Sequence, residues 1–156
     1  MKQHSYAVTV KWTAAPGSGT RSYRDYDRSH AIMAEDKSEI AGSADPSFLG
    51  DPARWNPEEL LVASLSACHK LWFLALCAQA GIEVVDYIDE AGGTMVEEKD
   101  GAGQFEEVVL RPQVTIAGGD IDMARSLHEK AHRMCFIARS VNFPVRHEAS
   151  IAMLEN

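Results

Sequence analysis

The sequence contains few cysteines, and they lie far apart. There are three in 156 residues, at positions 68, 77 and 135. A secreted domain held together by disulfides has an even and denser set of cysteines, so that class of protein is excluded. In a reducing compartment each thiol is either a buried apolar residue or a reactive group. Each of the three therefore has to be assigned to one of these two kinds.

The sequence also lacks clustered positive charge. The formal net charge is −8, and the lysines and arginines are scattered singly. Nucleic-acid affinity rests largely on grouped Lys and Arg side chains, so we expect no nucleic-acid partner. The first thirty residues have no long apolar run after a positive start, which a secretory signal would need. We therefore expect a cytoplasmic protein.

No internal repeat, low-complexity tract or proline-rich linker is present. With 46% apolar and 24% charged residues, the length suits one globular domain over residues 1–156. The only long stretch without a helix or strand pattern is 35–56, where glycines and prolines recur. We expect this stretch to be one surface loop, and a loop of that length usually has a function.

One long helix is predicted between Asn56 and Gly81. Asn56 offers an N-cap side chain, Pro57 suits the first helical position, and Glu59 can reach back to the cap. Residues 60–80 are almost all apolar, and Gly81 can adopt the left-handed conformation that ends a helix.

The burial of this helix predicts a second subunit. A helix that is apolar nearly all round is normally buried on every side. At about 1.5 Å per residue it is about 36 Å long, more than one small domain can wrap. His69 and Lys70 lie in the middle of the apolar run, and charge at a bilayer centre is costly. We therefore expect a partner protein chain around the helix and no membrane span.

The other patterns predict strands and a second helix. Alternating apolar residues predict strands with one buried face at 6–12 and 144–154, and a second strand paired to the first at 21–27. Two further strands, 84–98 and 104–117, are predicted to form a hairpin across 100–103. A helix capped by Asp120 or Asp122 should run toward Cys135. The expected fold class is α+β with antiparallel sheets.

Two segments carry a resemblance to a known family. The stretches NPEELLVASLSACHKLWFLALCAQAGIEV and AHRMCFIARSVNFPV place one cysteine ten residues after the first Glu of a helix and another in the following helical region. In order and spacing the sequence resembles the OsmC/Ohr family of organic hydroperoxide reductases over essentially the whole chain. The resemblance implies an OsmC-like fold, with antiparallel sheets around long buried central helices, and an intertwined homodimer.

The same resemblance implies a thiol-dependent peroxidase. Cys68 corresponds to the thiol that attacks the hydroperoxide and becomes a sulfenic acid, and Cys135 to the thiol that condenses with it to a disulfide. The implied substrate is an organic hydroperoxide, reduced to an alcohol. The implied reductant is a dihydrolipoyl group, thioredoxin or a small thiol, and no cofactor is implied. Cys77 is nine residues from Cys68, on the other side of the helix, and is expected to be a core thiol.

Glu58 corresponds to a family glutamate that orients an arginine near the reactive sulfur. An ordinary thiol, with a pKa near ~8.5, is mostly protonated at neutral pH, so a permanent positive charge favours the thiolate. Arg54 is our first choice for this arginine and Arg24 the alternative, with Arg28 close by in the sequence. Ten helical residues separate Glu58 from Cys68, about 15 Å, so we expect a site shared between the two subunits.

Two competing interpretations remain open. The segment HEKAH places His128 and His132 four residues apart with Glu129 between them, the pattern of a zinc-binding or metallohydrolase-like site. The metal reading is the weaker one, because the continuation with glycine and a third histidine is absent. Phe136 stands after Cys135 where many relatives have proline, which would matter if Cys135 failed to reach Cys68. In that case the chain would be a one-thiol relative or a non-catalytic OsmC-like binding protein.

Overall fold

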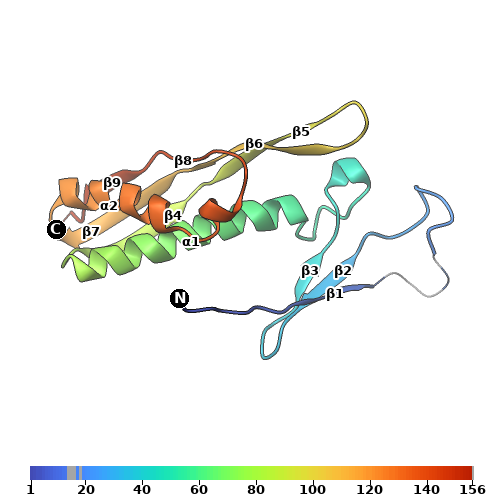
Figure 1. Cartoon of the computed structure of the whole chain (residues 1–156), viewed down its shortest axis with the longest axis horizontal. Coiled ribbons are helices and arrows are strands. Elements are labelled where there is room, and N and C mark those ends of the chain that lie inside the picture. The colour runs from blue at the N-terminus through green and yellow to red at the C-terminus, as the bar shows by residue number, and fades with distance from the viewer. Residues whose placement is uncertain (14–16, 18, 156) are drawn as a thin grey trace. The chain divides into compact units, whose positions relative to one another are not determined.

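The computed structural model describes residues 1–13, 17 and 19–155. The chain divides into two compact units, Met1–Leu61 and Val62–Asn156. The elements of both are drawn in Figure 1. Each unit has its own sheet structure, and the long helix begins in the first unit and continues through the second.

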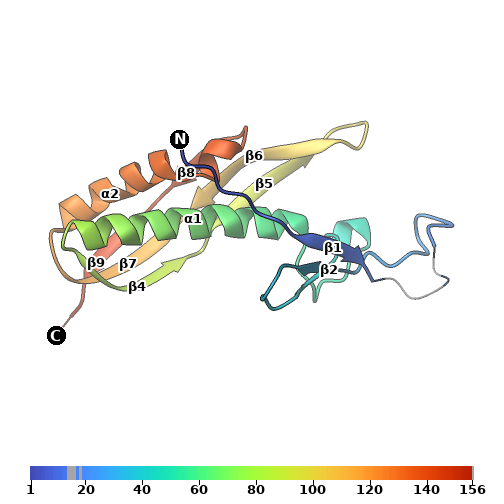
Figure 2. The same ribbon diagram turned by 60° about the horizontal axis from the view of Figure 1, so that its bottom comes forward.

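The first unit is built on a three-stranded antiparallel sheet in the order β1-β2-β3. The strands are β1 (Thr9–Trp12), β2 (His30–Met33) and β3 (Ile40–Gly42), and a short 3-10 helix, η1 (Pro46–Phe48), follows. Figure 2 shows β1 lying alongside β2. Trp12 pairs with His30, and His30 pairs in turn with Gly42.

The sequence prediction was wrong in three places in this unit. Residues 21–27 form turns rather than a strand, and the partner of β1 is β2. The turns are held locally, because Arg28 donates to the carbonyls of Tyr23 and Tyr26. The stretch 35–56 is not one loop, since β3 and η1 lie within it. Finally, β1 is exposed along its whole length in the single chain, so the buried face expected of it has no cover here.

The helix α1 (Pro57–Gln79) has the predicted ends. The backbone N–H of Glu59 donates to Asn56 Oδ1 at 2.8 Å, and the backbone N–H of Asn56 donates to Glu59 Oε2 at 3.2 Å. This reciprocal pair is a capping box. At the other end Gly81 has φ 71°, and the N–H of Ile82 donates to the carbonyl of Cys77 at 2.9 Å. The helix therefore ends in a Schellman motif, as glycine at that position predicts.

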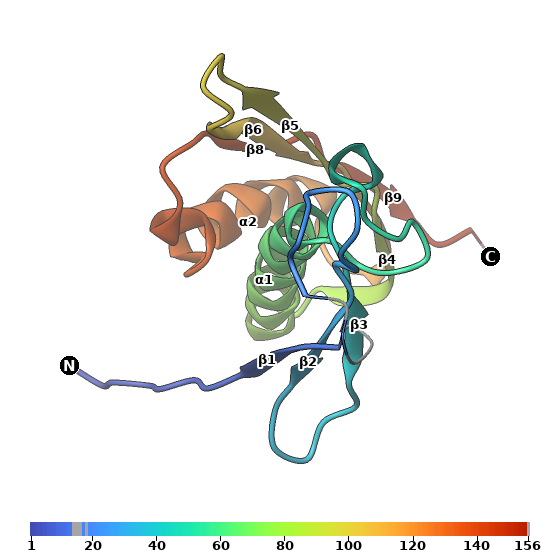
Figure 3. The ribbon, with the colours of Figure 1, turned by 90° about the vertical axis from the view of Figure 1, so that its right-hand side faces the viewer.

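The second unit contains six strands in two sheets and a second helix, α2 (Ile121–Met134), with a short 3-10 helix, η2 (Ala138–Ser140), after it. The sheets have the orders β4-β7-β9 and β5-β6-β8. The strands are β4 (Glu83–Asp89), β5 (Gly92–Glu97), β6 (Gly103–Leu110), β7 (Pro112–Gly118), β8 (Val145–His147) and β9 (Ser150–Met153). Figure 3 shows α1 and α2 on the same side of β5, β6 and β8.

The strands of this unit differ from the prediction in number and direction. The β5–β6 hairpin and the cap of α2 by Asp120 are confirmed. Each of the two strands predicted at 84–98 and 104–117 is divided into two in the structure, which gives β4, β5, β6 and β7. The division arises because the β5–β6 hairpin belongs to one sheet and the flanking strands β4 and β7 belong to the other. The strand predicted at 144–154 is also divided into two, β8 and β9. β8 pairs in parallel with β6, and β9 pairs in parallel with β7. The fold is therefore α+β with mixed sheets, because the crossover through α2 returns the chain in the same direction.

The core of the second unit lies between the two helices and the sheet of β4, β7 and β9. Its buried members are Phe73, Leu76, Cys77, Ile82, Val114, Ile116, Ala124 and Ala131. Only five residues of α1 are buried, while Leu71 on the same helix is 63% exposed. By length and hydropathy α1 could cross a membrane, a test that core helices of soluble proteins also pass. The burial on all sides expected for this helix is thus not provided by its own chain.

Candidate functional site

Cys68 and Cys135 meet where α1 and α2 lie side by side. Cys68 is in the middle of α1 and half-buried, whereas Cys135 is the C-cap residue of α2 and only 1% exposed. Their side chains are in hydrogen-bond contact, and all three cysteines are free thiols. The backbone N–H of Ala138 donates to Cys135 Sγ at 3.4 Å. The structure thus brings together the two cysteines that the sequence analysis paired.

The surroundings of Cys135 keep it protonated. Burial, followed by the hydrogen bond to Cys68, raises the pKa of the Cys135 thiol to about 11. A protonated Cys135 can donate its S–H to the sulfur of Cys68. The two thiols are therefore unlike: Cys68 is half-buried, whereas Cys135 is a fully buried donor beside it. Such a pair can form a disulfide once Cys68 is oxidised.

Cys77 takes no part in this arrangement. It is fully buried in the core of the second unit, and burial raises the pKa of its thiol to about 11. A buried thiol with a raised pKa is unreactive toward electrophiles. The expectation that Cys77 is a core thiol agrees with this placement.

Glu58 lies at a cavity of about 350 Å³ in the first unit. Its Oε2 atom is buried and has no hydrogen-bond partner among the residues that the structure describes. The cavity walls also include Trp12, Tyr26, Arg28 and His30. The guanidinium of Arg28 lies 3.7 Å from the ring centroid of Tyr26, a cation–π contact that fixes its position. Glu58 and Arg28 therefore line the same cavity.

The two arginines favoured from the sequence lie elsewhere in the first unit. Arg54 forms an ion pair with Asp51, at 3.6 Å between Nε and Oδ2, and Arg24 is exposed in the turn at 21–27. Neither lines the cavity at Glu58, whereas Arg28 does. One feature of the sequence favours Arg28: Tyr23 and Tyr26 lie shortly before it. Their aromatic rings can bind the guanidinium of Arg28 through cation–π contacts.

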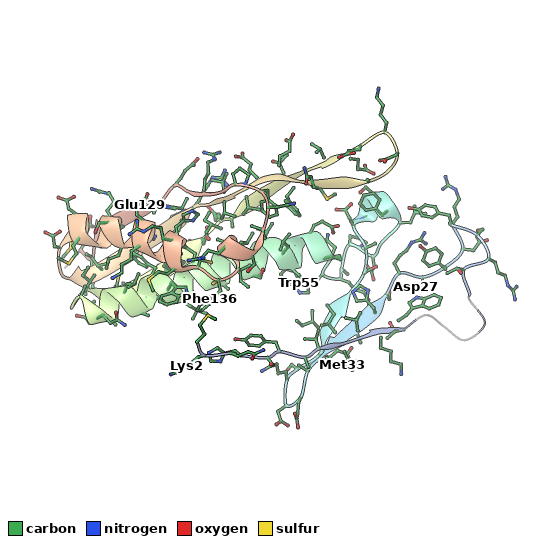
Figure 4. All side chains as sticks on the ribbon, in the orientation of Figure 1. Lys2, Asp27, Met33, Trp55, Glu129 and Phe136 are labelled. Atoms are coloured by element: carbon green, nitrogen blue, oxygen red, sulfur yellow. The ribbon has the colours of Figure 1, made fainter. Side chains whose placement is uncertain are left out.

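The contacts of the HEKAH segment differ from those of a two-histidine metal site. His128 is 1% exposed, stacks on Phe73 with ring centroids 3.8 Å apart, and has its Nδ1 atom 2.9 Å from His69 Nε2. Glu129 contacts His147, at 3.3 Å. Figure 4 labels Glu129 on α2 and Phe136 just beyond the end of that helix. Within the described part of the chain, no three His, Cys, Asp or Glu side chains are placed to hold a metal ion. These contacts count against the zinc interpretation.

The buried histidines are neutral at physiological pH. Burial, then the nearby His147 and His132, lowers the pKa of His69 to about 4. Burial, then His69 and His147, lowers the pKa of His128 to about 3. The sequence analysis did not connect His69 with His128, because 59 positions separate the two.

Phe136 does not prevent the contact between the two thiols. Its side chain is 68% exposed and packs edge-on against Trp72, with ring centroids 5.5 Å apart. The two rings, with Met134, Arg139 and Ser140, line a shallow pocket. The backbone after Cys135 turns into η2 without a proline, so the local turn does not require one.

Comparison with known proteins places the whole chain in one family. The OsmC-like protein family matches residues 50–150. The uncharacterised protein YmaD of Bacillus subtilis is 27% identical over 160 aligned residues, covering 98% of this chain and 98% of YmaD. An OsmC-like protein of unknown function from Vibrio cholerae has a similar structure, with TM-score 0.83 and 34% identity over 96% of this chain and 100% of its own.

A more distant likeness concerns the fold alone. The organic hydroperoxide resistance protein OhrB of Bacillus subtilis is 21% identical, with TM-score 0.60 over 93% of this chain and 98% of that one. The family match covers more than half of the chain, and the Vibrio cholerae protein is similar over almost all of it. The protein therefore belongs to the OsmC-like protein family.

Proposed function

We propose that the protein is a thiol peroxidase that reduces organic hydroperoxides to alcohols. The observation that carries the proposal is the contact of a half-buried thiol, Cys68, with a fully buried, protonated one, Cys135. Membership of the OsmC-like family and a fold shared with proteins named for organic hydroperoxide resistance support it. The two units together make one OsmC-like domain over residues 1–156 in this proposal.

The reaction uses two thiols and consumes one hydroperoxide. The thiolate of Cys68 attacks the terminal peroxide oxygen, the O–O bond breaks, and the alkoxide leaves as an alcohol after taking a proton. Cys68 is then a sulfenic acid. The Cys135 thiol displaces its hydroxyl, so that a disulfide forms and water leaves. A dithiol such as a dihydrolipoyl group, thioredoxin, or two small thiols then reduce the disulfide and are oxidised in turn.

An arginine oriented by Glu58 supplies the positive charge at Cys68 in this proposal. Arg54 and Arg24 were the choices from sequence, and Arg28 is supported by its place at the same cavity as Glu58. Glu58 and Cys68 are ten residues apart on α1, about 15 Å along the helix axis. We therefore propose that the arginine and Glu58 of one subunit serve the Cys68 of the other.

A homodimer also accounts for the apolar surface of α1. The helix is apolar along most of its length, yet most of it is not buried by its own chain. Apolar surface of that extent on a soluble protein usually marks an interface. A second copy packed against α1 would give an intertwined dimer of a soluble, cytoplasmic protein.

Thiol counting tests the proposed reaction directly. The reduced protein is mixed with one equivalent of cumene hydroperoxide, and free thiols are counted under denaturing conditions before and after. We expect two thiols to be lost and one equivalent of alcohol to form. The Cys77→Ala variant should behave in the same way, because Cys77 is outside the dithiol. Loss of no thiol would leave the chain a non-catalytic OsmC-like binding protein.

A further inference from the structure

A cluster of four histidines in the second unit has no role in the proposed reaction. His69 comes from α1, His128 and His132 from α2, and His147 from β8. The centroids of neighbouring rings in the cluster are between 5.2 and 6.0 Å apart. Four imidazole rings are thus held together by three elements.

The centre of the cluster is a buried pair. His69 and His128 are each 1% exposed, and the Nε2 atom of His69 lies 2.9 Å from the Nδ1 atom of His128. The rings are nearly coplanar, at 5°. Phe73, one turn along α1 from His69, covers a face of the His128 ring at a centroid distance of 3.8 Å. The pair therefore links α1 directly to α2. When both rings are neutral, the N–H of one ring donates to the lone pair of the other.

The pair has no internal partner for a second proton. His69 Nδ1 and His128 Nε2 are buried and lack hydrogen-bond partners within the described part of the chain. Doubly protonated rings would leave N–H groups and positive charge in the interior, which is costly.

The charged groups around the pair do not offset that cost. Glu129 is engaged with His147 at 3.3 Å, and the ring of His132 packs on His147 as well. From β4, Tyr87 packs on Phe73, and burial raises the pKa of its hydroxyl, so it stays neutral. The pocket beside His128 is also lined by Asp122, which pairs with Arg125 at 2.9 Å, and by Glu148, which pairs with Arg111 and Arg146.

The pair and the dithiol are two contacts between the same two helices. His69 follows Cys68 directly on α1, and His128 precedes Cys135 by seven residues on α2, about 10 Å along the helix. Besides His128, the fully buried side chains of α2 are the small ones of Ala124 and Ala131, whereas Ile121 and Leu127 pack against the core only partly buried. Separation of the histidines would therefore loosen the end of α2 that carries Cys135.

We propose that the His69–His128 pair is an acid-sensitive latch, whose neutral rings hold α2 against α1 and whose protonation releases α2 and moves Cys135 away from Cys68. The effect on turnover rests on the proposed peroxidase function, whereas the opening of α2 does not. Burial and the neighbouring histidines lower the pKa of His69 to about 4 and that of His128 to about 3. Released rings regain an ordinary pKa of about 6.5, so opening is coupled to the uptake of two protons.

Hydrogen–deuterium exchange of the α2 amides tests the latch without any peroxide. With two protons bound on opening, the ratio of open to closed α2 should rise by up to about 100-fold for each pH unit below about 6. Exchange is measured at pH 7, 6 and 5 and corrected for the intrinsic amide rate. The His69→Leu/His128→Phe double variant should keep its α2 protection at pH 5, because it has no buried ring to protonate. The His4→Gln variant changes an exposed histidine of the first unit and should behave as the wild type.

Two outcomes overturn the proposal. One is α2 protection that does not change with pH in the wild type, and the other is a double variant that opens with the same pH dependence as the wild type. If the double variant does not fold, NMR of ¹⁵N-histidine-labelled wild type tests the latch instead, because it follows the protonation of each histidine ring. Loss of α2 protection must then coincide with protonation of two rings, and titration of both rings without any loss of protection contradicts the latch.

Discussion

The thiol of Cys135 contacts Cys68 from a position at which it also ends α2. Its backbone N–H donates to the carbonyl of His132 at 3.3 Å, and its sulfur accepts the N–H of Ala138 at 3.4 Å. The sulfur is therefore fixed by the end of one helix and held against the middle of another. Contact between the two side chains is the starting geometry from which a disulfide can form once Cys68 is oxidised.

Replacing Cys68 with serine should abolish peroxide consumption and leave the fold intact. Serine is close in size, but its hydroxyl has no comparable reactivity toward a peroxide. We expect the rate of cumene hydroperoxide loss to fall to that of the buffer alone, with unchanged circular dichroism. Cys77→Ala is the matched control, because it removes a thiol from the core. Full activity in Cys68→Ser would rule out the proposed mechanism.

The Cys77→Ala control makes a prediction of its own about stability. Removing a fully buried sulfur leaves a small cavity in the core, and we expect a loss of about 1–2 kcal/mol in the free energy of unfolding. Urea unfolding measures this loss. A change in the rate of peroxide reduction at saturating reductant, on the other hand, would show that Cys77 does more than fill the core.

Replacing Cys135 with serine should stop the reaction after its first step. Without a second thiol, the Cys68 sulfenic acid persists and is oxidised further by excess peroxide. Mass spectrometry of the treated protein should show a mass increase of one oxygen at one equivalent of peroxide and of two or three oxygens at higher excess. A disulfide between Cys68 and Cys77 in this variant would instead mean that α1 unwinds, since the two lie on different sides of one helix.

The parts of the fold that the sequence predicts correctly are those fixed by local chemistry. The capping box at Asn56, the turn at Gly81 and the Asp120 cap each depend on a side chain within a few residues of the backbone group it binds. The errors arise where distant residues decide. The residues 21–27 alternate in character as a strand does, but hydrogen bonds from the side chain of Arg28 to their carbonyls hold them in turns. The direction in which β8 and β9 run depends on the path of α2 before them.

The candidate site likewise contains features that the sequence predicts and features that only the packing of distant residues decides. A family pattern is enough to pair Cys68 with Cys135, and the contact between them agrees. The sequence offered Arg24, Arg28 and Arg54 as candidate arginines, and it is the packing of the first unit that puts Arg28, rather than the other two, at the Glu58 cavity. The link between His69 and His128 has no local signal at all.

Three single arginine variants decide which guanidinium acts at Cys68. We expect Arg28→Ala to lower kcat/KM by about 100-fold or more, the usual cost of removing one charge-stabilising donor. Arg24→Ala and Arg54→Ala are the matched controls from the same unit, and each should lose much less. The rate of Cys68 alkylation by iodoacetamide at fixed pH should follow the same order. A dominant effect of Arg54→Ala in both assays would restore the choice made from the sequence.

The stability of the fold should fall steeply between pH 6.5 and pH 4. The pKa values of His69 and His128 are lowered on folding, to about 4 and about 3, from an ordinary value of about 6.5. The neutral rings therefore contribute stability that is fully present above pH 6.5 and is lost as the pH falls, because only the unfolded chain binds the protons. Two protons correspond to a slope approaching about 2.7 kcal/mol per pH unit. Urea unfolding at pH 7, 6 and 5 measures the slope, and a flat profile would contradict the burial of the pair.

The last prediction concerns a site shared between two subunits. If Glu58 of one subunit serves Cys68 of the other, then Glu58→Ala and Cys68→Ser are each inactive as homodimers but complement each other in a mixed dimer. One hybrid site then carries both changes and the other carries neither. Random pairing of equal amounts gives about half heterodimers, each with one intact site of two, so about a quarter of wild-type activity should return after joint refolding.

Mixing Cys68→Ser with Cys135→Ser is the control for this experiment. Cys68 and Cys135 meet within one chain, so each hybrid site of that mixture lacks one thiol and activity should stay at the background level. Heterodimer formation is verified in both mixtures by native mass spectrometry with one isotope-labelled partner. A monomer at micromolar concentration in sedimentation, or verified Glu58→Ala/Cys68→Ser heterodimers without activity, would show that each chain builds its site alone.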